Sequence, residues 1–208
     1  MNRRELLKSL GAFTAGGAMI GCDEESSCGI SEDQTAGPYY LDLDAIRADI
    51  TEDRGGVTLL LKLAVVDAES CEPIEGAVVE VWHADADGVY SGFSGQGTED
   101  ETWLRGALIA DEGGEAGFET IYPGSYPGRT PHLHVRVSAD GYDELVTQVY
   151  FPGAANERIG LEYGEGDTDN DSDGFYEAAN ELEVYEDSAG ACVATGSLAL
   201  RSDGASDG

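Results

Sequence analysis

The chain has 208 residues, enough for one domain with a real core, and its 42 Asp and Glu against 11 Lys and Arg give a formal net charge of −31. This excess of negative charge repels nucleic acid and anionic lipid head groups, so we expect neither as a partner. It suits a surface adapted to high salt, where self-repulsion is screened.

The amino terminus has the features of an export signal. Arg3 and Arg4 precede a short apolar run, rich in Gly and Ala, over residues 10–20. Paired arginines before such a run are typical of a twin-arginine signal, and the run is too short to span a membrane comfortably. The tetrapeptide Met-Ile-Gly-Cys that ends at Cys22 resembles a bacterial lipoprotein cleavage box. We therefore predict a signal over 1–21 and a mature protein lipid-anchored to the cell membrane, facing the periplasm or cell exterior; a plain signal beside an unrelated cysteine is the alternative.

Composition also divides the rest of the chain. Residues 22–34 are acidic and Ser-rich, which predicts a flexible tether, and the Ser/Asp/Gly stretch 201–208 predicts a disordered tail, so the domain is expected over 35–200. An oxidising compartment would allow one disulfide among three further cysteines, Cys28, Cys71 and Cys192. The sequence does not select the pair; Cys71 and Cys192 flank predicted strands and are the first choice.

Short β-rich segments follow one another through the domain. They are separated by Gly, Asp and Pro loops, and all six prolines fall in those loops or at strand edges. The predicted strands are 57–66, 77–84, 104–110, 117–121, 132–138, 144–151, 182–187 and 192–200. No segment has the apolar period of a convincing amphipathic helix. We therefore predict an all-β fold, an antiparallel β-sandwich with few or no helices.

An acidic stretch late in the chain resembles a calcium-binding loop. Asp169, Asp171 and Asp173 occupy its first, third and fifth positions, but the twelfth is Asn180 rather than an acid. We expect a solvated acidic turn, with weak calcium binding as the alternative.

Two of the three histidines, His132 and His134, lie in the strand predicted at 132–138. Because alternate residues of a strand share a face, their imidazoles are expected on one side, close enough to bind one metal ion. An ordinary strand with two solvent-facing histidines is the alternative.

A histidine pair needs further ligands to form a metal site. The chain has no Cys-x-x-Cys, no His-Glu-x-x-His and no glutamate shortly after His134. Tyrosines remain, and Tyr90, Tyr122 and Tyr126 lie near turns. A phenol has a pKa of about 10, so a hard, highly charged ion is needed to remove its proton. Two histidines with two tyrosines therefore indicate ferric iron.

Five segments, in order along the chain, resemble the intradiol ring-cleavage dioxygenases, the family of protocatechuate 3,4-dioxygenase and catechol 1,2-dioxygenase. They are 35–40 (TAGPYY), 71–84 (CEPIEGAVVEVWHA) with 88–91 (GVYS), 120–127 (TIYPGSYP), 129–134 (RTPHLH) and 147–153 (TQVYFPG). No single segment is decisive, but the five in this order are highly specific.

The resemblance implies a site and a reaction. The residues at the family's ligand positions for one non-haem Fe(III) are Tyr90, Tyr126, His132 and His134. Tyr126 would be the ligand that a catecholic substrate displaces, taking a substrate proton. Arg129 would stabilise negative charge on the bound ring, and Gln148 would support Arg129. The reaction would cleave the ring between its two hydroxylated carbons with O2, giving a cis,cis-muconate type diacid.

Two aromatic residues and several alternatives remain. Tyr122 matches no ligand position and is assigned to packing, and His83 is expected to be a strand histidine near the site. The chain lacks the long N-terminal helical region of catechol-type members, and protocatechuate-type members complete their pocket with a partner chain, so a homo-oligomer is compatible with the sequence. A non-catalytic β-sandwich lipoprotein that binds a ligand or partner, and a zinc or copper hydrolase, are the competing functions.

Overall fold

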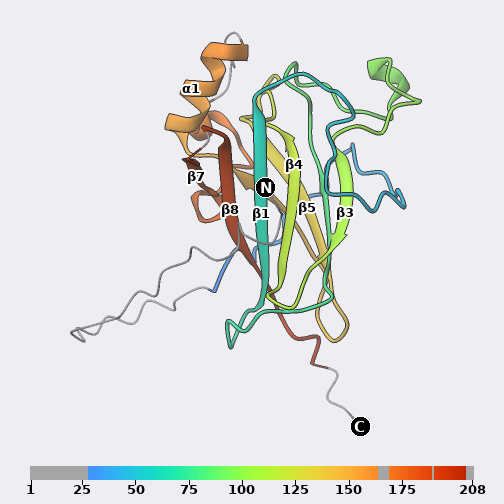
Figure 1. Cartoon of the computed structure of the whole chain (residues 1–208), viewed down its shortest axis with the longest axis vertical. Helices are drawn as coiled ribbons and strands as arrows, with labels where there is room; N and C mark the ends of the chain where they lie inside the picture. Colours follow the sequence, from blue (N-terminus) through green and yellow to red (C-terminus); the bar gives the residue numbers. More distant parts are fainter. Residues whose placement is uncertain (1–27, 164–168, 189, 205–208) are drawn as a thin grey trace, which may run out of the picture.

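A computed structural model describes residues 28–163, 169–188 and 190–204 (Figure 1). Two four-stranded sheets make up the fold, with strand orders β4-β1-β8-β7 and β3-β2-β5-β6. The predicted export signal at 1–21 and the start of the predicted tether lie outside the described residues. No helix in the described part of the chain is long and apolar enough to cross a membrane.

The first sheet is built around β1, a long apolar strand. Its members are β1 (Thr58–Asp67), β4 (Glu115–Ile121), β7 (Glu183–Glu186) and β8 (Cys192–Leu200). β1 pairs antiparallel with β4 and parallel with β8, and β7 pairs antiparallel with β8. The predicted β-sandwich is confirmed, with the parallel β1–β8 pair as a difference from the expected antiparallel pattern.

The second sheet carries both histidines of the His-x-His motif. Its members are β2 (Val78–Trp82), β3 (Arg105–Ile109), β5 (His132–Ser138) and β6 (Leu145–Tyr150). All three of its pairs are antiparallel: β2 with β3, β2 with β5, and β5 with β6. β5 therefore lies between two hydrogen-bonded neighbours, which fixes the positions of the side chains on its faces.

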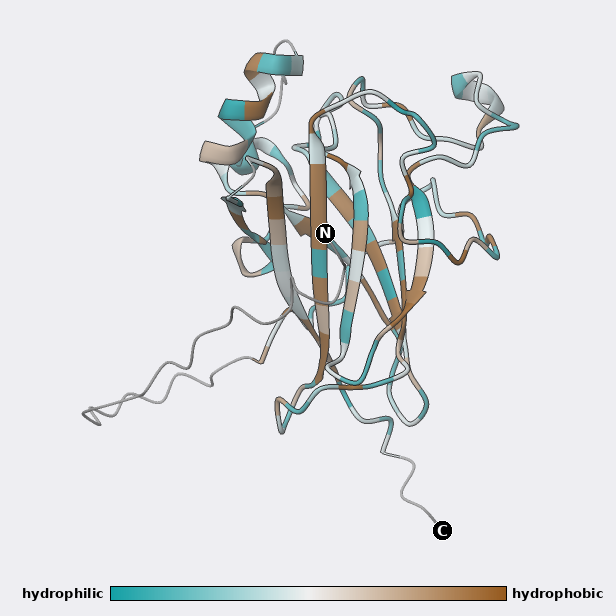
Figure 2. Ribbon diagram, in the orientation of Figure 1, coloured by the Kyte–Doolittle hydropathy of each residue, from teal (hydrophilic) through white to brown (hydrophobic). Residues whose placement is uncertain are grey.

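The core forms between the two sheets. Leu59, Leu61 and Leu63 alternate along β1 and are buried in the same cluster as Val135 and Val137 of β5. Figure 2 shows hydrophobic colouring concentrated along the strands. Each such side chain contributes about 1.5–3 kcal/mol by leaving water, so this alternation sets which face of each strand turns inward. Residues 132 and 134 of β5 are then left on the face turned away from the core.

Helical structure is limited in the described residues, and most of it follows β6. The described part of the chain has one α-helix, α1 (Gly153–Tyr163), which lies beyond one end of the sheets (Figure 1). It also has three single 3₁₀ turns, Ser94–Gln96, Asn170–Ser172 and Ala178–Asn180. Among the side chains of α1 only Ile159 is buried. The sequence of α1 therefore lacks the apolar stripe by which an amphipathic helix is predicted.

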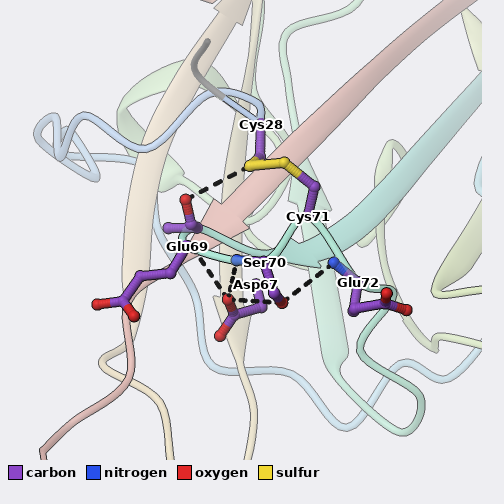
Figure 3. The surroundings of a disulfide bond; sticks show 7 residues. Cys28, Asp67, Glu69, Ser70, Cys71 and Glu72 are labelled. Carbon is purple, nitrogen blue, oxygen red and sulfur yellow. Dashed lines mark hydrogen bonds between the residues drawn. A yellow bond between two sulfur atoms is a disulfide. The ribbon is translucent and has the colours of Figure 1, made fainter. Parts of the chain in front are cut away.

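A disulfide joins Cys28 to Cys71 in the turn after β1 (Figure 3). The expected Cys71–Cys192 pair is wrong: Cys192 is a free, buried residue of the core. Its position at the start of β8 turns its side chain inward, whereas Cys71 lies in an exposed turn. That turn is held by the carboxylate of Asp67, which accepts hydrogen bonds from the backbone N–H and the hydroxyl of Ser70.

Both ends of the predicted domain extend further than expected. Ile30 is buried and exchanges backbone hydrogen bonds with Ser197 and Ala199 of β8, so residues 28–34 are not a flexible tether. Ser202 forms a β-bridge with Tyr142, so the first residues of the predicted disordered tail also lie against the domain. Composition did not reveal either extension, because backbone hydrogen bonds and the single buried side chain of Ile30 hold these ends in place.

Candidate metal centre

The centre of the candidate site is the outward face of β5. His132 and His134 are both buried, and their ring centroids are 5.0 Å apart. His134 lies between Trp82 of β2 and Gln148 of β6 in the strand register, and its ring stacks on Trp82 at 5.1 Å. The two imidazoles are therefore held side by side on a rigid sheet, not exposed to solvent.

Tyr90 reaches this face from the turn after β2. The carboxylate of Asp85 accepts hydrogen bonds from the backbone N–H groups of Asp87 and Val89, which closes the turn. Gly88 has a φ of +77° and lies so close to the next loop that a Cβ would be 2.6 Å from the carbonyl oxygen of Ser125. Only glycine fits there, and this lets the turn of Tyr90 meet the loop of Tyr126.

The two phenols and two imidazoles converge. The Tyr90 hydroxyl lies 3.5 Å, and the Tyr126 hydroxyl 3.3 Å, from Nε2 of His132. The rings of Tyr90 and His134 are 6.1 Å apart, centroid to centroid, and those of Tyr90 and Tyr126 are 6.0 Å apart. All four residues selected from the sequence as ligands are thus brought to one place, although Tyr90 and His132 are 42 positions apart.

Hydrogen bonding leaves imidazole nitrogens free at this place. Nδ1 of His132 lies 2.7 Å from the carbonyl oxygen of Thr130, which can only accept, so the proton is on Nδ1 and the lone pair of Nε2 faces the tyrosines. Both ring nitrogens of His134 are buried without a hydrogen-bond partner among the described residues. Buried polar atoms are rarely left without a partner, and a metal ion can accept the lone pair of an imidazole nitrogen.

Burial controls the protonation of these groups. It lowers the pKa of His132 to about 3 and that of His134 well below the ordinary value, so both imidazoles are neutral near pH 7. It also raises the pKa of the Tyr90 and Tyr126 phenols. A phenolate can exist here only if a cation compensates its burial, so the donors fit a small, highly charged ion.

Other donor sets are not available in the described part of the chain. There, no group of three or more His, Cys, Asp and Glu side chains is arranged to hold a metal ion. A site built on His132 and His134 therefore requires the tyrosines. This donor set differs from the Cys and His sets of structural zinc and from the oxygen cage of calcium.

Residues 37–40, the covering segment, lie over the site. Tyr39 stacks on Tyr90 with ring centroids 4.3 Å apart, and its backbone carbonyl accepts a hydrogen bond of 2.7 Å from Arg105. Gly37, with a φ of +67°, lies against His134, because a Cβ there would be 3.2 Å from Cε1 of that ring. Tyr40 turns to a different partner, the guanidinium of Arg136. This segment shields the imidazoles from solvent on one side.

Arg129 lies beside the phenols, as the resemblance implies. Its Nη1 donates to the Tyr126 hydroxyl at 3.3 Å and its Nη2 donates to Oε1 of Gln148. Gln148 is fixed in turn, since its Nε2 donates to the carbonyl oxygen of Thr35. A positive charge is therefore held next to Tyr126 by a buried amide.

Asp173 is a site residue that the sequence did not reveal. The expectation of a solvated acidic turn is wrong for Asp173, which is buried and forms an ion pair with Arg129, Nε to Oδ2, at 2.9 Å. Asp169 and Asp171 remain exposed. The calcium-like spacing gave no sign of this pairing, because the arginine lies 44 positions earlier.

Two aromatic candidates stay outside the group. Tyr122 is buried in the core and its hydroxyl donates to Asn156 at 2.7 Å, so it packs as predicted. His83 is fully buried and bonds the carbonyl oxygen of Ala84 and the hydroxyl of Thr120. Both ring nitrogens of His83 are thus already used.

Comparisons with known proteins agree with this geometry. A family model described as Dioxygenase matches residues 35–157. A chlorocatechol 1,2-dioxygenase of Rhodococcus opacus is 36% identical over 127 residues, which are 52% of this chain and 47% of the relative. The structure of an intradiol ring-cleavage dioxygenase from Tetranychus urticae matches with a TM-score of 0.75 at 32% identity, covering 84% of this chain and 95% of that one.

A third match is a single domain of a larger protein. The dioxygenase domain of a carbohydrate-binding fusion protein from Streptomyces sp. SirexAA-E matches with a TM-score of 0.67 at 29% identity, covering 83% of this chain and 98% of that one. The chain spans about half the length of the curated relatives it matches. The family model matches more than half of the chain, and the matched range 35–157 includes every residue of the site except Asp173. The chain belongs to the intradiol ring-cleavage dioxygenase family.

Proposed function

We propose that this protein is a non-haem Fe(III)-dependent dioxygenase that cleaves a catecholic ring between its two hydroxylated carbons. One O2 is consumed, and both of its atoms enter a cis,cis-muconate type diacid. The observation that carries the proposal is the convergence of the buried phenol of Tyr90, the partly buried phenol of Tyr126 and two neutral imidazoles, with no partner for either nitrogen of His134 among the described residues. Relatives named catechol, chlorocatechol and hydroxyquinol 1,2-dioxygenase support it.

The ion would be held by Tyr90, Tyr126, His132 and His134. Neutral imidazoles supply lone pairs without charge, and two phenolates offset most of a 3+ charge, which makes the site more favourable for ferric than for divalent iron. Bound ferric iron would withdraw electron density from a coordinated catecholate and so prepare its ring for reaction with O2. The remaining contributions come from the chain.

Proton transfer is assigned to Tyr126. Its hydroxyl is the more accessible of the two phenols, because Tyr90 is 1% exposed and covered by Tyr39. When a catecholic hydroxyl arrives, the Tyr126 oxygen takes its proton and becomes a neutral phenol. Nη1 of Arg129 lies 3.3 Å from the Tyr126 oxygen. From there the guanidinium stabilises the negative charge that remains on the substrate, at low dielectric where such an interaction is strong.

Positioning and exclusion of water are assigned to the covering segment and to β6. Tyr39 and Gly37 close the side of the site next to Tyr90 and His134. Gln148 fixes one terminal nitrogen of Arg129 and is held by the sheet. A site on a sheet keeps its groups in place through the reaction, which lowers the barrier by orientation.

Export and a lipid anchor at Cys22 are part of the proposal. The Cys28–Cys71 disulfide supports it, because disulfides persist outside the reducing cytoplasm. The test is cell fractionation of the full chain. Cys22→Ser is expected to release the protein from the membrane fraction, and replacement of Arg3 and Arg4 by Lys is expected to retain it in the cytoplasm.

The activity is tested by oxygen uptake with a panel of catechols. Iron-loaded protein is expected to consume one O2 per catechol and to show the visible absorbance of phenolate bound to ferric iron. Metal analysis of untagged protein should find one iron per chain. A colourless preparation that holds another metal, or none after iron loading, would overturn the proposal.

A further inference from the structure

Asp173 is a buried carboxylate outside the proposed ligand set. Its side chain is fully shielded from solvent, and a buried carboxylate is stable only with a positive or hydrogen-bonding partner. Nε of Arg129 lies 3.1 and 2.9 Å from its two oxygens. The backbone N–H groups of Thr130 and Phe175 donate to the same carboxylate at 3.0 and 2.9 Å. Asp173 is thus saturated with donors and held in one position.

This carboxylate determines how Arg129 faces the site. A guanidinium is planar, so fixing Nε fixes the directions of its two terminal nitrogens. Those nitrogens donate to the Tyr126 hydroxyl and to Gln148. The ring of Phe175 lies against the guanidinium, 4.9 Å from its centre. The hydrogen bond from Nε to Asp173 therefore also orients the two terminal nitrogens toward Tyr126 and Gln148.

The segment that carries Asp173 is itself tied to the loop before β5. Asp169 caps the 3₁₀ turn Asn170–Ser172 by accepting a hydrogen bond of 2.8 Å from the backbone of Ser172. Oδ1 of Asn170 accepts from the hydroxyl of Thr130 at 2.7 Å. Since Thr130 lies between Arg129 and His132, these bonds connect the segment 169–173 to the loop that precedes β5.

We propose that Asp173 is a positioning residue for the ring-cleavage reaction, holding the guanidinium of Arg129 against Tyr126 and Gln148. The inference rests on the proposed function, because Arg129 acts on substrate charge only at a catecholic site. Loss of the carboxylate leaves Arg129 charged but without the partner that fixes its Nε, and removes none of the four proposed ligands. Turnover should therefore fall while iron binding persists.

The test uses full-length, iron-loaded protein with Asp173→Asn, and Asp171→Asn as matched control. Asp171 is exposed and two positions away, so the same chemical change is made outside the contact. Asp173→Asn is expected to lower kcat for catechol about 10- to 100-fold, with a much smaller change in KM, unchanged iron content and unchanged visible absorbance. Asp171→Asn should match the wild type. Asp173→Glu, which keeps the charge, should restore part of kcat.

A double-variant cycle separates positioning from general stability. If Asp173 acts through Arg129, Asp173→Asn combined with Arg129→Gln should lose no more activity than Arg129→Gln alone. If Asp173 only stabilised the fold, independently of Arg129, the double variant would lose activity by the product of the two single-variant factors.

A second readout uses the metal-free protein. The Nε–H signal of Arg129 in a ¹⁵N NMR spectrum is assigned by its absence in Arg129→Gln. It should exchange slowly with solvent in the wild type and in Asp171→Asn, and rapidly in Asp173→Asn.

The outcomes are distinct. If the wild type is active, any of three results would overturn the inference and leave the proposed function standing. They are a wild-type kcat in Asp173→Asn, multiplied losses in the double variant, and slow exchange of the Arg129 signal in Asp173→Asn. A wild type that binds iron but consumes no O2 with any catechol would overturn the proposed function, and the inference with it.

Discussion

Tyr90 and Tyr122 form a matched pair, because both are buried but only Tyr90 lies at the candidate metal centre. Tyr90→Phe removes one proposed ligand oxygen and keeps the ring. We expect it to lose most bound iron and visible absorbance, together with oxygen uptake. Tyr122→Phe removes a hydroxyl that donates to Asn156 and should cost about 1 kcal/mol of stability without loss of iron. Metal analysis and absorbance spectra of both variants make the measurement.

The same comparison can contradict the ligand assignment. If Tyr90→Phe keeps one iron per chain and its colour, Tyr90 is not a ligand. If both variants lose iron equally, the loss reflects disturbed packing and not a missing ligand.

His83 predicts a pH dependence of stability that is independent of the metal. Burial lowers its pKa to about 4, below the ordinary value of 6.5 that it regains when unfolded. As the pH falls below 6.5 the unfolded chain binds the proton first, so stability is lost down to about pH 4, by about 1.4 kcal/mol per pH unit. Above pH 6.5 the full contribution is present.

The measurement is urea unfolding of metal-free protein at pH 7, 6 and 5. His83→Gln keeps hydrogen-bonding groups near Thr120 but does not titrate, so its free energy of unfolding should fall less steeply than that of the wild type. Carboxylates contribute equally to both proteins and cancel in the difference. Parallel curves for the two proteins would show that folding does not lower the pKa of His83, and would contradict the prediction.

At the scale of elements, the strands were predictable and their partners were not. The short, β-rich apolar run at 57–66 identifies β1 from the sequence, and β5 begins at His132 as predicted. The parallel pairing of β1 with β8 depends on contacts between segments far apart in the chain, which no local pattern encodes. α1 was missed because it buries only Ile159. Long-range packing, not local propensity, decided the β1–β8 pairing and the position of α1.

The site shows the same division between local and distant information. His132 and His134 share a face because a strand has a period of two, and this was readable from spacing alone. The roles of Tyr90 and Tyr126 were reached through resemblance to a family. Asp173 was assigned to a solvated turn because neither spacing nor resemblance links it to Arg129.

The Cys28–Cys71 disulfide is expected to stabilise the fold by closing a long loop. The two cysteines are 43 positions apart, and the loop-entropy estimate for such a length is about 3–4 kcal/mol. Cys28→Ser and Cys71→Ser should each lower the free energy of unfolding by about this amount, and the double variant by no more than either. Urea unfolding under non-reducing conditions measures the loss.

Peptide mapping of unreduced protein provides the control. It should yield a peptide pair that links Cys28 to Cys71, with Cys192 reactive to alkylation only after unfolding. A linked pair that contains Cys192 would contradict this arrangement.

At the scale of the whole molecule, charge opposes compactness. The formal net charge of −31 places many carboxylates on a small surface, and basic residues are few. Several of those bases are already used locally: Arg47 pairs with Glu52, Arg54 with Asp85 and Arg129 with Asp173. Repulsion among the remaining acids destabilises the folded state until salt screens it.

Stability should therefore rise with salt. Between about 0.1 and 1 M NaCl the Debye length falls from about 10 to about 3 Å, so repulsion between exposed carboxylates largely disappears. We expect the urea midpoint of unfolding to increase over this range. A variant in which the exposed Glu99, Asp100 and Glu101 become Gln, Asn and Gln should be more stable at low salt and respond less to added salt. A midpoint independent of salt in both proteins would show that the acids are spaced widely enough for water alone to screen them.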